Sequence, residues 1–199
     1  MIRIAAAAVL LVAACSLSPS ASLAPLGSAD GSQPLSPAAT VTARTFEDGE
    51  LHVGTDVPPG TYRVVRAPSQ DPEDFCYWER VSGFGGSSAE TIGNSAGVGP
   101  RVATIDPSDA GFISQHCGTW TSDLSPLPVP IDDGVWIVGV DVQPGHYTSQ
   151  GGTACVWQRL SGFGGTSDES TEVGSVGSVE IIPTDKGFSS SHCGTWLPG

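Results

Sequence analysis

The chain carries nearly the same sequence twice, and this duplication limits its possible folds more than any other feature. Phe-Ile-Ser-Gln-His-Cys-Gly-Thr-Trp at 112–120 returns as Phe-Ser-Ser-Ser-His-Cys-Gly-Thr-Trp at 188–196. Upstream, Cys-Tyr-Trp-Glu-Arg-Val-Ser-Gly-Phe-Gly-Gly begins at Cys76, and Cys-Val-Trp-Gln-Arg-Leu-Ser-Gly-Phe-Gly-Gly begins at Cys155. The sequence therefore describes one module used twice, in which a residue kept in both copies is structural or belongs to a duplicated site.

The N-terminus predicts export. Arg3 is followed by an apolar run from Ala5 to Ala14, which is far shorter than the roughly 20 residues of a membrane-spanning helix and is typical of a signal peptide over residues 1–14. The run ends in Leu-Val-Ala-Ala-Cys at Cys15, which resembles a bacterial lipobox, so we expect Cys15 to be acylated. The alternative is ordinary secretion with cleavage near Ala14 or within 16–24, which would leave Cys15 as an odd thiol or remove it.

The number of cysteines supports the predicted acylation of Cys15. Of five cysteines, four fall two per repeat at matching places, and Cys15 is left over. Among the three possible pairings of the four, the duplication favours one bridge within each repeat, Cys76–Cys117 and Cys155–Cys193, and an exported compartment permits both. A diacylglyceryl group would supply two chains, which is enough for stable membrane anchoring.

Composition divides the chain into five parts. After the signal peptide, residues 15–44 are rich in Ser, Ala, Pro and Leu, and predict a lipidated, disordered tether. The modules span 45–120 and 135–199. Alternating prolines between them, at 121–134, favour an extended spacer and hence two separate bodies.

The net charge of the chain limits the classes of partner that it can bind. Without residues 1–14 the chain has seven basic and 21 acidic residues, a net charge of −14. Such a surface repels nucleic acid and anionic lipid headgroups. We therefore expect contact with the membrane through the lipid alone, and no nucleic-acid partner.

The modules predict an all-β fold. Short alternating segments rich in β-branched and aromatic residues are separated by Pro and Gly, and no window shows a sustained helical period. We predict two tandem, disulfide-stapled β-sandwich or barrel modules. In a strand, Cys76, Trp78 and Arg80 share one face, and the same three residue types recur from Cys155 on. That face should point inward, with the arginines forming salt bridges or binding loop carbonyls at the edge of the core.

The repeated Ser-Gly-Phe-Gly-Gly loops are the leading candidates for partner binding. Phe84 and Phe163 could contact a partner or plug the end of each module. Trp120 and Trp196 could stack on a sugar ring or fill the core. His116 and His192 precede the second cysteine of each copy, and we expect both at the surface.

The sequence motifs give little support to a catalytic site or a metal site. Gly-Asn-Ser-Ala-Gly at 93–97 fits the nucleophile elbow of hydrolases with Ser95 as nucleophile, but that motif needs a strand–turn–helix in a large parallel sheet. Repeat two lacks the pattern. No Cys or His spacing suggests a metal site, so we expect no catalytic residues, no metal and no cofactor.

The pattern Val-x-Pro-Gly-x-Tyr, Cys-x-Trp-x-Arg-x-Ser-Gly and Cys-Gly-Thr-Trp resembles a small module of exported proteins and lipoproteins of actinobacteria, over about residues 49–120 and 134–196. The resemblance implies an extracytoplasmic β module and supplies no activity. We expect a non-enzymatic binding protein on the outer face of the plasma membrane, held by its lipid, with a cell-wall or envelope protein or glycan as partner. The alternatives are an envelope hydrolase and a purely structural spacer.

Overall fold

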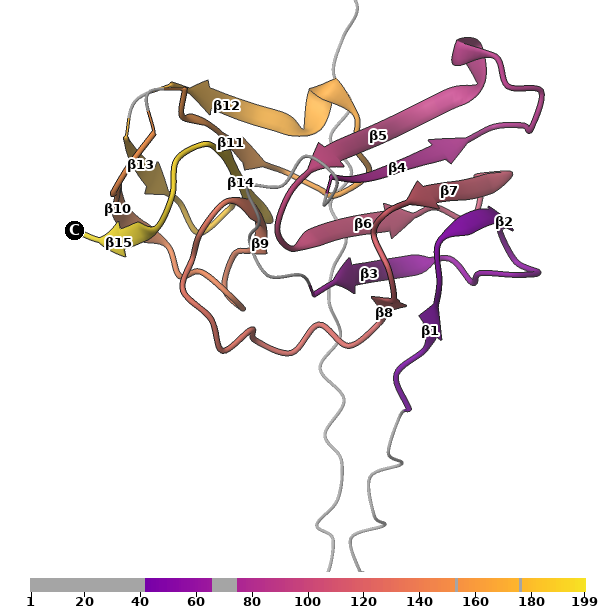
Figure 1. Ribbon diagram of the computed structural model, residues 1–199, viewed down its shortest axis with the longest axis horizontal. Helices are drawn as coiled ribbons and strands as arrows, with labels where there is room; N and C mark the ends of the chain where they lie inside the picture. The colour runs from indigo at the N-terminus through magenta and orange to yellow at the C-terminus, as the bar shows by residue number, and fades with distance from the viewer. Residues whose placement is uncertain (1–41, 66–74, 153, 176) are drawn as a thin grey trace, which may run out of the picture. The chain divides into compact units, whose positions relative to one another are not determined.

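The computed structural model describes residues 42–65, 75–152, 154–175 and 177–199 (Figure 1). The predicted signal peptide, the acylation of Cys15 and the tether up to residue 41 lie outside the described residues. No described helix has the length and apolar character needed to cross a bilayer.

Repeat one consists of two four-stranded antiparallel sheets, with strand orders β1-β8-β3-β6 and β2-β7-β4-β5. A short 3₁₀ turn, Ser88–Glu90, precedes β5. The strands are β1 (Thr45–Phe46), β2 (Gly49–His52), β3 (Gly60–Val64), β4 (Cys76–Val81), β5 (Thr91–Gly97), β6 (Arg101–Ile105), β7 (Gly111–Gln115) and β8 (Trp120–Thr121).

Repeat two has the same topology without a counterpart of β1. Its sheets have the orders β13-β10-β15 and β12-β11-β14-β9, and Ser167–Glu169 is its 3₁₀ turn. Its strands are β9 (Gly134–Ile137), β10 (Gly145–Ser149), β11 (Val156–Leu160), β12 (Ser170–Gly174), β13 (Ser178–Ile181), β14 (Gly187–Ser191) and β15 (Trp196–Pro198). The prediction of two all-β modules is confirmed, and each is a sandwich of two open sheets.

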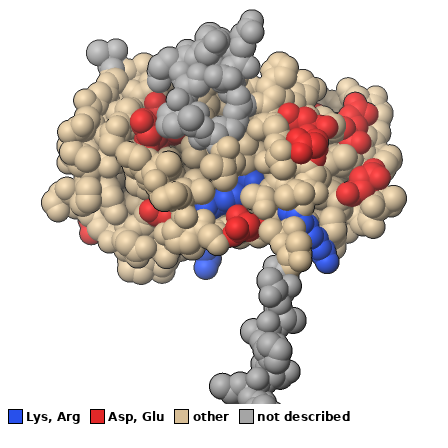
Figure 2. All heavy atoms as spheres, turned by 60° about the horizontal axis from the view of Figure 1, so that its bottom comes forward, with Lys and Arg blue, Asp and Glu red and all other residues tan. Residues whose placement is uncertain are grey.

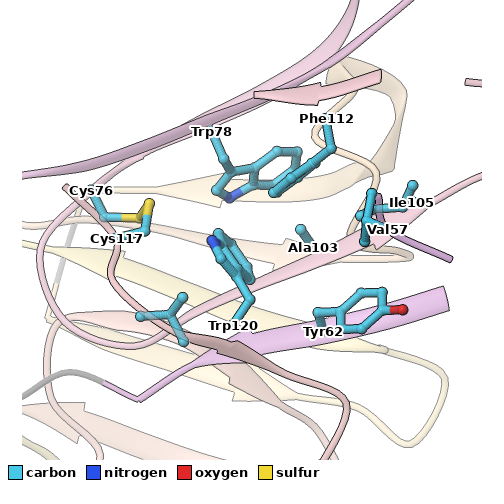
Figure 3. Close-up of a cluster of buried hydrophobic side chains, with 10 residues drawn as sticks. Val57, Tyr62, Cys76, Trp78, Ala103, Ile105, Phe112, Cys117 and Trp120 are labelled. Atoms are coloured by element: carbon cyan, nitrogen blue, oxygen red, sulfur yellow. A yellow bond between two sulfur atoms is a disulfide. The ribbon is translucent and has the colours of Figure 1, made fainter. Parts of the chain in front are cut away.

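Each core lies between the two sheets of one repeat. In repeat one, Trp78, Phe112 and Trp120 pack near the disulfide, with the indole of Trp120 edge-on to the Phe112 ring at 5.2 Å between centroids (Figure 3). Phe188 and Trp196 repeat this contact at 5.1 Å. Because aromatic side chains bury large apolar areas, they supply most of the core of a module this small.

The disulfides join the cysteines as predicted. Cys76 bonds to Cys117 and Cys155 to Cys193, with both bridges inside their own repeat and all four residues buried. Cys76 and Trp78 occupy the inward face of β4, as the strand alternation predicts. Each bridge therefore joins the start of one strand, β4 or β11, to the segment that leads from one sheet of the sandwich to the other.

The prediction of two separate bodies is wrong. Residues 41–199 form one compact unit, and the backbone N–H of Val135 donates to Pro100 O across the repeats. The segment between the repeats is itself packed, because Leu127 and Ile131 contribute apolar side chains to the second core. The prolines keep this segment extended, while the apolar residues between them hold it against repeat two.

Candidate functional site at the junction of the repeats

The Ser-Gly-Phe-Gly-Gly loop of repeat two, residues 161–165, docks on repeat one. Three consecutive carbonyls accept hydrogen bonds: Phe163 O from the N–H of Thr104 at 2.8 Å, and Gly165 O from the N–H of Asn94 at 3.0 Å. Between them, Gly164 O accepts from Arg80 Nη1 at 3.2 Å. Since β5 and β6 are edge strands of their sheets, the loop satisfies backbone donors that a sandwich leaves open.

The fit depends on a glycine in repeat one. A Cβ at Gly93 would lie 2.2 Å from Gly164 O, so any side chain there would push the loop away. By strand register, Gly93 lies opposite Arg80, and the residue opposite Arg159 in repeat two is Glu172. The docking surface is therefore present in repeat one only.

The arginine that receives the loop is held by an ion pair. Arg80 Nε and Nη2 donate to the two carboxylate oxygens of Asp109 at 2.7 and 2.8 Å, and the Asp109 carboxylate is fully buried. The bond to Asp109 raises the pKa of Arg80. Arg159 forms the same pair with Asp185. The prediction that both arginines form salt bridges at the edge of the core is confirmed, and Arg80 also binds a loop carbonyl.

A cavity of about 470 Å³ lies at this junction, beside the docked loop. Repeat one lines it with Trp78, Asn94, Ser95 and Val102. The lining from repeat two is neutral except for one glutamate: it comprises Val135, Gln158, Leu160, Gly162, Phe163, Gly165, Thr166, Ser167, Glu169, Ser170, Val173 and Ser189.

A second cavity, of about 390 Å³, also borders the loop and is more highly charged. Its lining includes the cations Arg80 and Lys186 and the acids Asp106 and Glu169. Figure 2 shows one face of the molecule, on which basic side chains are confined to the lower middle and acidic groups are spread more widely. The neutral and the charged cavity share the loop residues 162–163 and Glu169 in their walls.

The corresponding loop of repeat one, residues 82–86, is exposed, with only Gly83 half-buried. The ring of Phe84 is 39% exposed and lies against His52, with 4.4 Å between ring centroids. The tip of the ring lies over Gly111, where a Cβ would be 2.2 Å from Cζ of Phe84. Phe84 thus closes the end of its module on one side and presents its other side to solvent.

The predicted aromatic candidates separate into two kinds. Phe163 is half-buried at the junction, where its ring covers Gly187 as Phe84 covers Gly111. Trp120 and Trp196 are 0% and 2% exposed, and the indole N–H of each donates to a serine of its own core. The two tryptophans therefore fill the cores and present no ring face to a sugar.

The two histidines are exposed, as predicted, and both adopt a left-handed backbone conformation. His116 has φ 55° and His192 has φ 56° in the turn that leads into the second cysteine of each repeat. This conformation is uncommon for residues other than glycine, although His is among those that tolerate it. Asp48 and Asp133 stabilise these turns by accepting the N–H of Cys117 and Cys193 respectively.

Duplicated acids are the residues that sequence reasoning missed. Glu90 and Glu169 accept backbone N–H groups of the Ser-Gly-Phe-Gly-Gly loops and complete capping boxes on the 3₁₀ turns. Asp56 and Asp141 each accept an N–H four residues upstream. Each acid recurs at the same place in both repeats, and this recurrence was the signal that could have found them.

Ser95 does not lie in a nucleophile elbow. It is in the middle of β5, paired with Trp78 of β4, and lines the neutral cavity. A strand interior is a different setting from the sharp strand-to-helix turn that the motif requires. Among the described side chains, no group of three or more His, Cys, Asp or Glu is placed to hold a metal ion.

Each of the two repeats matches the model of a known protein family. The model of the Rv1352-like extracellular domain matches the chain twice, at residues 43–121 and 129–197. The chain belongs to this family. Both copies of the Rv1352-like extracellular domain thus correspond to the two sandwiches, and the family places this part of the chain outside the cytoplasm.

The relatives come from mycobacteria. The uncharacterized protein Rv1352 of Mycobacterium tuberculosis (strain ATCC 25618 / H37Rv) is 31% identical over 82 residues, covering 37% of this chain and 66% of the relative. The uncharacterized protein Mb1387 of Mycobacterium bovis has the same identity and coverage. The chain thus spans slightly less than two thirds of the length of these relatives. No solved structure matches the chain. The comparisons support an extracellular actinobacterial module, as the sequence motifs indicate.

Proposed function

We propose that this chain is a non-enzymatic binding protein of the bacterial envelope, acylated at Cys15 and held on the outer face of the plasma membrane. Its contact surface for a partner is the exposed loop of repeat one, residues 82–86, with Phe84 at its centre. The partner is an envelope protein or a cell-wall glycan.

The docked loop of repeat two supports this role. The same five residues, Ser-Gly-Phe-Gly-Gly, bind a protein surface at 161–165 through three successive carbonyls. Glycine on both sides of the phenylalanine leaves these carbonyls accessible, because no side chain shields them. The loop at 82–86 has the same sequence, and a large aromatic side chain exposed on it is a typical anchor of an interface.

The surroundings of the acidic residues and of Ser95 support the non-enzymatic proposal, because the acids are already engaged in structural contacts. Asp109 and Asp185 are held by arginines, and Glu90 and Glu169 by loop N–H groups. Ser95 lines a cavity in which Glu169 is the one acidic or basic side chain among the described lining residues. Labelling of Ser95 by a serine-reactive probe, with loss of labelling in Ser95→Ala, would favour the hydrolase instead.

Retention on purified envelope fractions tests the contact surface. The mature chain and its Phe84→Ala variant are incubated with cell-wall and membrane-protein fractions, and the bound share is measured. We expect Phe84→Ala to reduce retention at least tenfold and to lower stability by only about 1–2 kcal/mol, because much of the ring is already exposed.

The matched control is Glu50→Gln. Glu50 is exposed and, like Phe84, lines a pocket of about 300 Å³ in repeat one. This substitution should leave retention within twofold. If Phe84→Ala binds as well as the parent chain, the loop is not the contact surface. If it loses far more stability than expected, Phe84 acts mainly as a plug of its module.

Intact-mass measurement of the protein from membranes tests the anchor. We expect a mature chain that begins at Cys15 and carries the added mass of a diacylglyceryl group, and we expect Cys15→Ala to move the protein to the medium. A chain without acyl mass that still sediments with membranes would contradict the anchor while leaving the loop proposal intact.

A further inference from the structure

The neutral cavity at the junction has no part in the function proposed above, which assigns binding to the exposed loop. Its volume of about 470 Å³ lies in the range of small-molecule sites, and such sites favour the interface between two modules. We propose that this cavity binds a neutral carbohydrate of one or two sugar rings.

The charge of the lining favours an uncharged ligand. Among the described residues that line the cavity, Glu169 is the one acidic or basic side chain, and its two carboxylate oxygens accept N–H groups from Gly164 at 2.9 Å and Thr166 at 3.3 Å. An anionic ligand would lose hydration on entry and meet no cation in the described lining, and a cationic ligand would find both Glu169 oxygens already bound to N–H groups. An anionic ligand is further opposed by the net charge of the whole chain.

The polar lining suits hydroxyl groups. Both repeats contribute side-chain amides, Asn94 from β5 and Gln158 from β11, and an amide can donate to one hydroxyl and accept from another. Ser170 Oγ is buried and has no hydrogen-bond partner within the described structure. Because buried polar atoms are normally hydrogen-bonded, this hydroxyl would gain a partner if a ligand uncovered it.

The remaining lining is apolar and matches the C–H faces of a sugar ring. Leu160 and Phe163 come from repeat two beside the docked loop, and Val102 comes from β6 of repeat one. A lining of apolar walls with a few placed hydrogen-bonding groups is the usual composition of a site that orients a small ligand. The site is complete only when the two repeats are joined, since each supplies one of the amides.

Nuclear magnetic resonance titration tests this site directly, because the side-chain amides of Asn94 and Gln158 give signals of their own. The mature chain with Cys15→Ser is titrated with cellobiose and, as charged probes, with glucuronate and glucosamine. We expect saturable shifts of both amide signals with cellobiose and a dissociation constant of about 0.1–10 mM. Glucuronate and glucosamine should bind at least tenfold more weakly.

Variants separate specific binding from general surface effects. Gln158→Leu keeps a similar size and removes the amide, and should weaken cellobiose binding about fivefold or more. Its matched control is Glu79→Gln at the corresponding position of β4, which lines the pocket beside Phe84 and should leave binding unchanged. Phe84→Ala should also leave it unchanged, so this proposal and the loop proposal can fail independently.

Three results would overturn the proposal. The first is the absence of saturable shifts with cellobiose across this concentration range. The second is glucuronate or glucosamine binding as tightly as cellobiose. The third is an equal effect of Gln158→Leu and Glu79→Gln, which would place any binding outside the junction cavity.

Discussion

Arg63 of the first repeat and Asp141 of the second form an ion pair in which both side chains are almost wholly buried, at 2% and 1% exposed. Nη2 of Arg63 lies 2.7 Å from Oδ2 of Asp141 and Nη1 lies 3.1 Å from Oδ1, so the contact is bidentate. Arg63 also donates to Ser125 O, and the N–H of Leu127 donates to Asp141. The pair therefore ties both repeats and the segment between them to one point.

Asp141→Asn should cost about 3–5 kcal/mol of unfolding free energy, because it leaves the charge of Arg63 buried without a counter-charge. The matched control is Asp56→Asn, since Asp56 accepts the equivalent local N–H in repeat one and is exposed. It should cost about 1 kcal/mol. Denaturant unfolding of both variants measures the difference, and equal losses would show that the pair between the repeats adds nothing.

Removing the first disulfide should destabilise the chain about as much as removing the second. The bridges span 41 and 38 residues, and the chain-entropy model gives about 4 kcal/mol for each. We expect Cys76→Ala/Cys117→Ala and Cys155→Ala/Cys193→Ala to lower the unfolding free energy by values within about 1 kcal/mol of each other. A difference of several kcal/mol in thermal or denaturant unfolding would show that one bridge acts chiefly through its core contacts.

Gly93→Glu should separate the docked loop from repeat one. A side chain at this position meets Gly164 O, so we expect a loss of about 2–4 kcal/mol and faster hydrogen exchange at the amides of Asn94 and Thr104. The reciprocal change, Glu172→Gly, should leave exchange at these two amides unchanged. Unaltered protection in Gly93→Glu would mean that the loop bonds do not hold the repeats together.

Two exposed aspartates should titrate below the ordinary value of 3.8. The hydroxyl of Ser108, and then its backbone N–H, lower the pKa of Asp106, and Ser125 lowers the pKa of Asp123 in the same way. Because each pKa is lower in the folded chain, this stabilisation is present above the unfolded value and is lost as pH falls through the folded value.

Carboxyl titration by nuclear magnetic resonance measures the pKa values of Asp106 and Asp123. Ser108→Ala should raise the pKa of Asp106 toward 3.8 and leave that of Asp123 unchanged, because only the first loses its hydroxyl donor. A pKa of Asp106 that does not move would assign the shift to the backbone N–H alone.

The sequence predicted the parts of the fold that both repeats share. Strand alternation around Trp78 and the paired cysteines was enough for the two sandwiches, because burial of aromatic side chains and bridge closure act within one module. The junction was missed for a physical reason. It depends on residues that occur once, such as Arg63 and Gly93, and a comparison of the two repeats gives no signal for such residues.

The prolines between the repeats also misled the prediction of separate bodies. They favour an extended backbone, but they do not decide whether that backbone is solvated or packed. Leu127 and Ile131 decide it, because burying their side chains on the second core offsets the entropy lost by ordering the segment.

The edge strands of repeat two carry acids where those of repeat one receive the loop. Glu172 replaces Gly93, and by strand register Glu180 of β13 stands where Thr104 stands in β6. Charged residues on an edge strand oppose pairing with another chain. The edge strands of repeat two therefore oppose the docking of a further Ser-Gly-Phe-Gly-Gly loop, and the surface that receives such a loop is confined to repeat one.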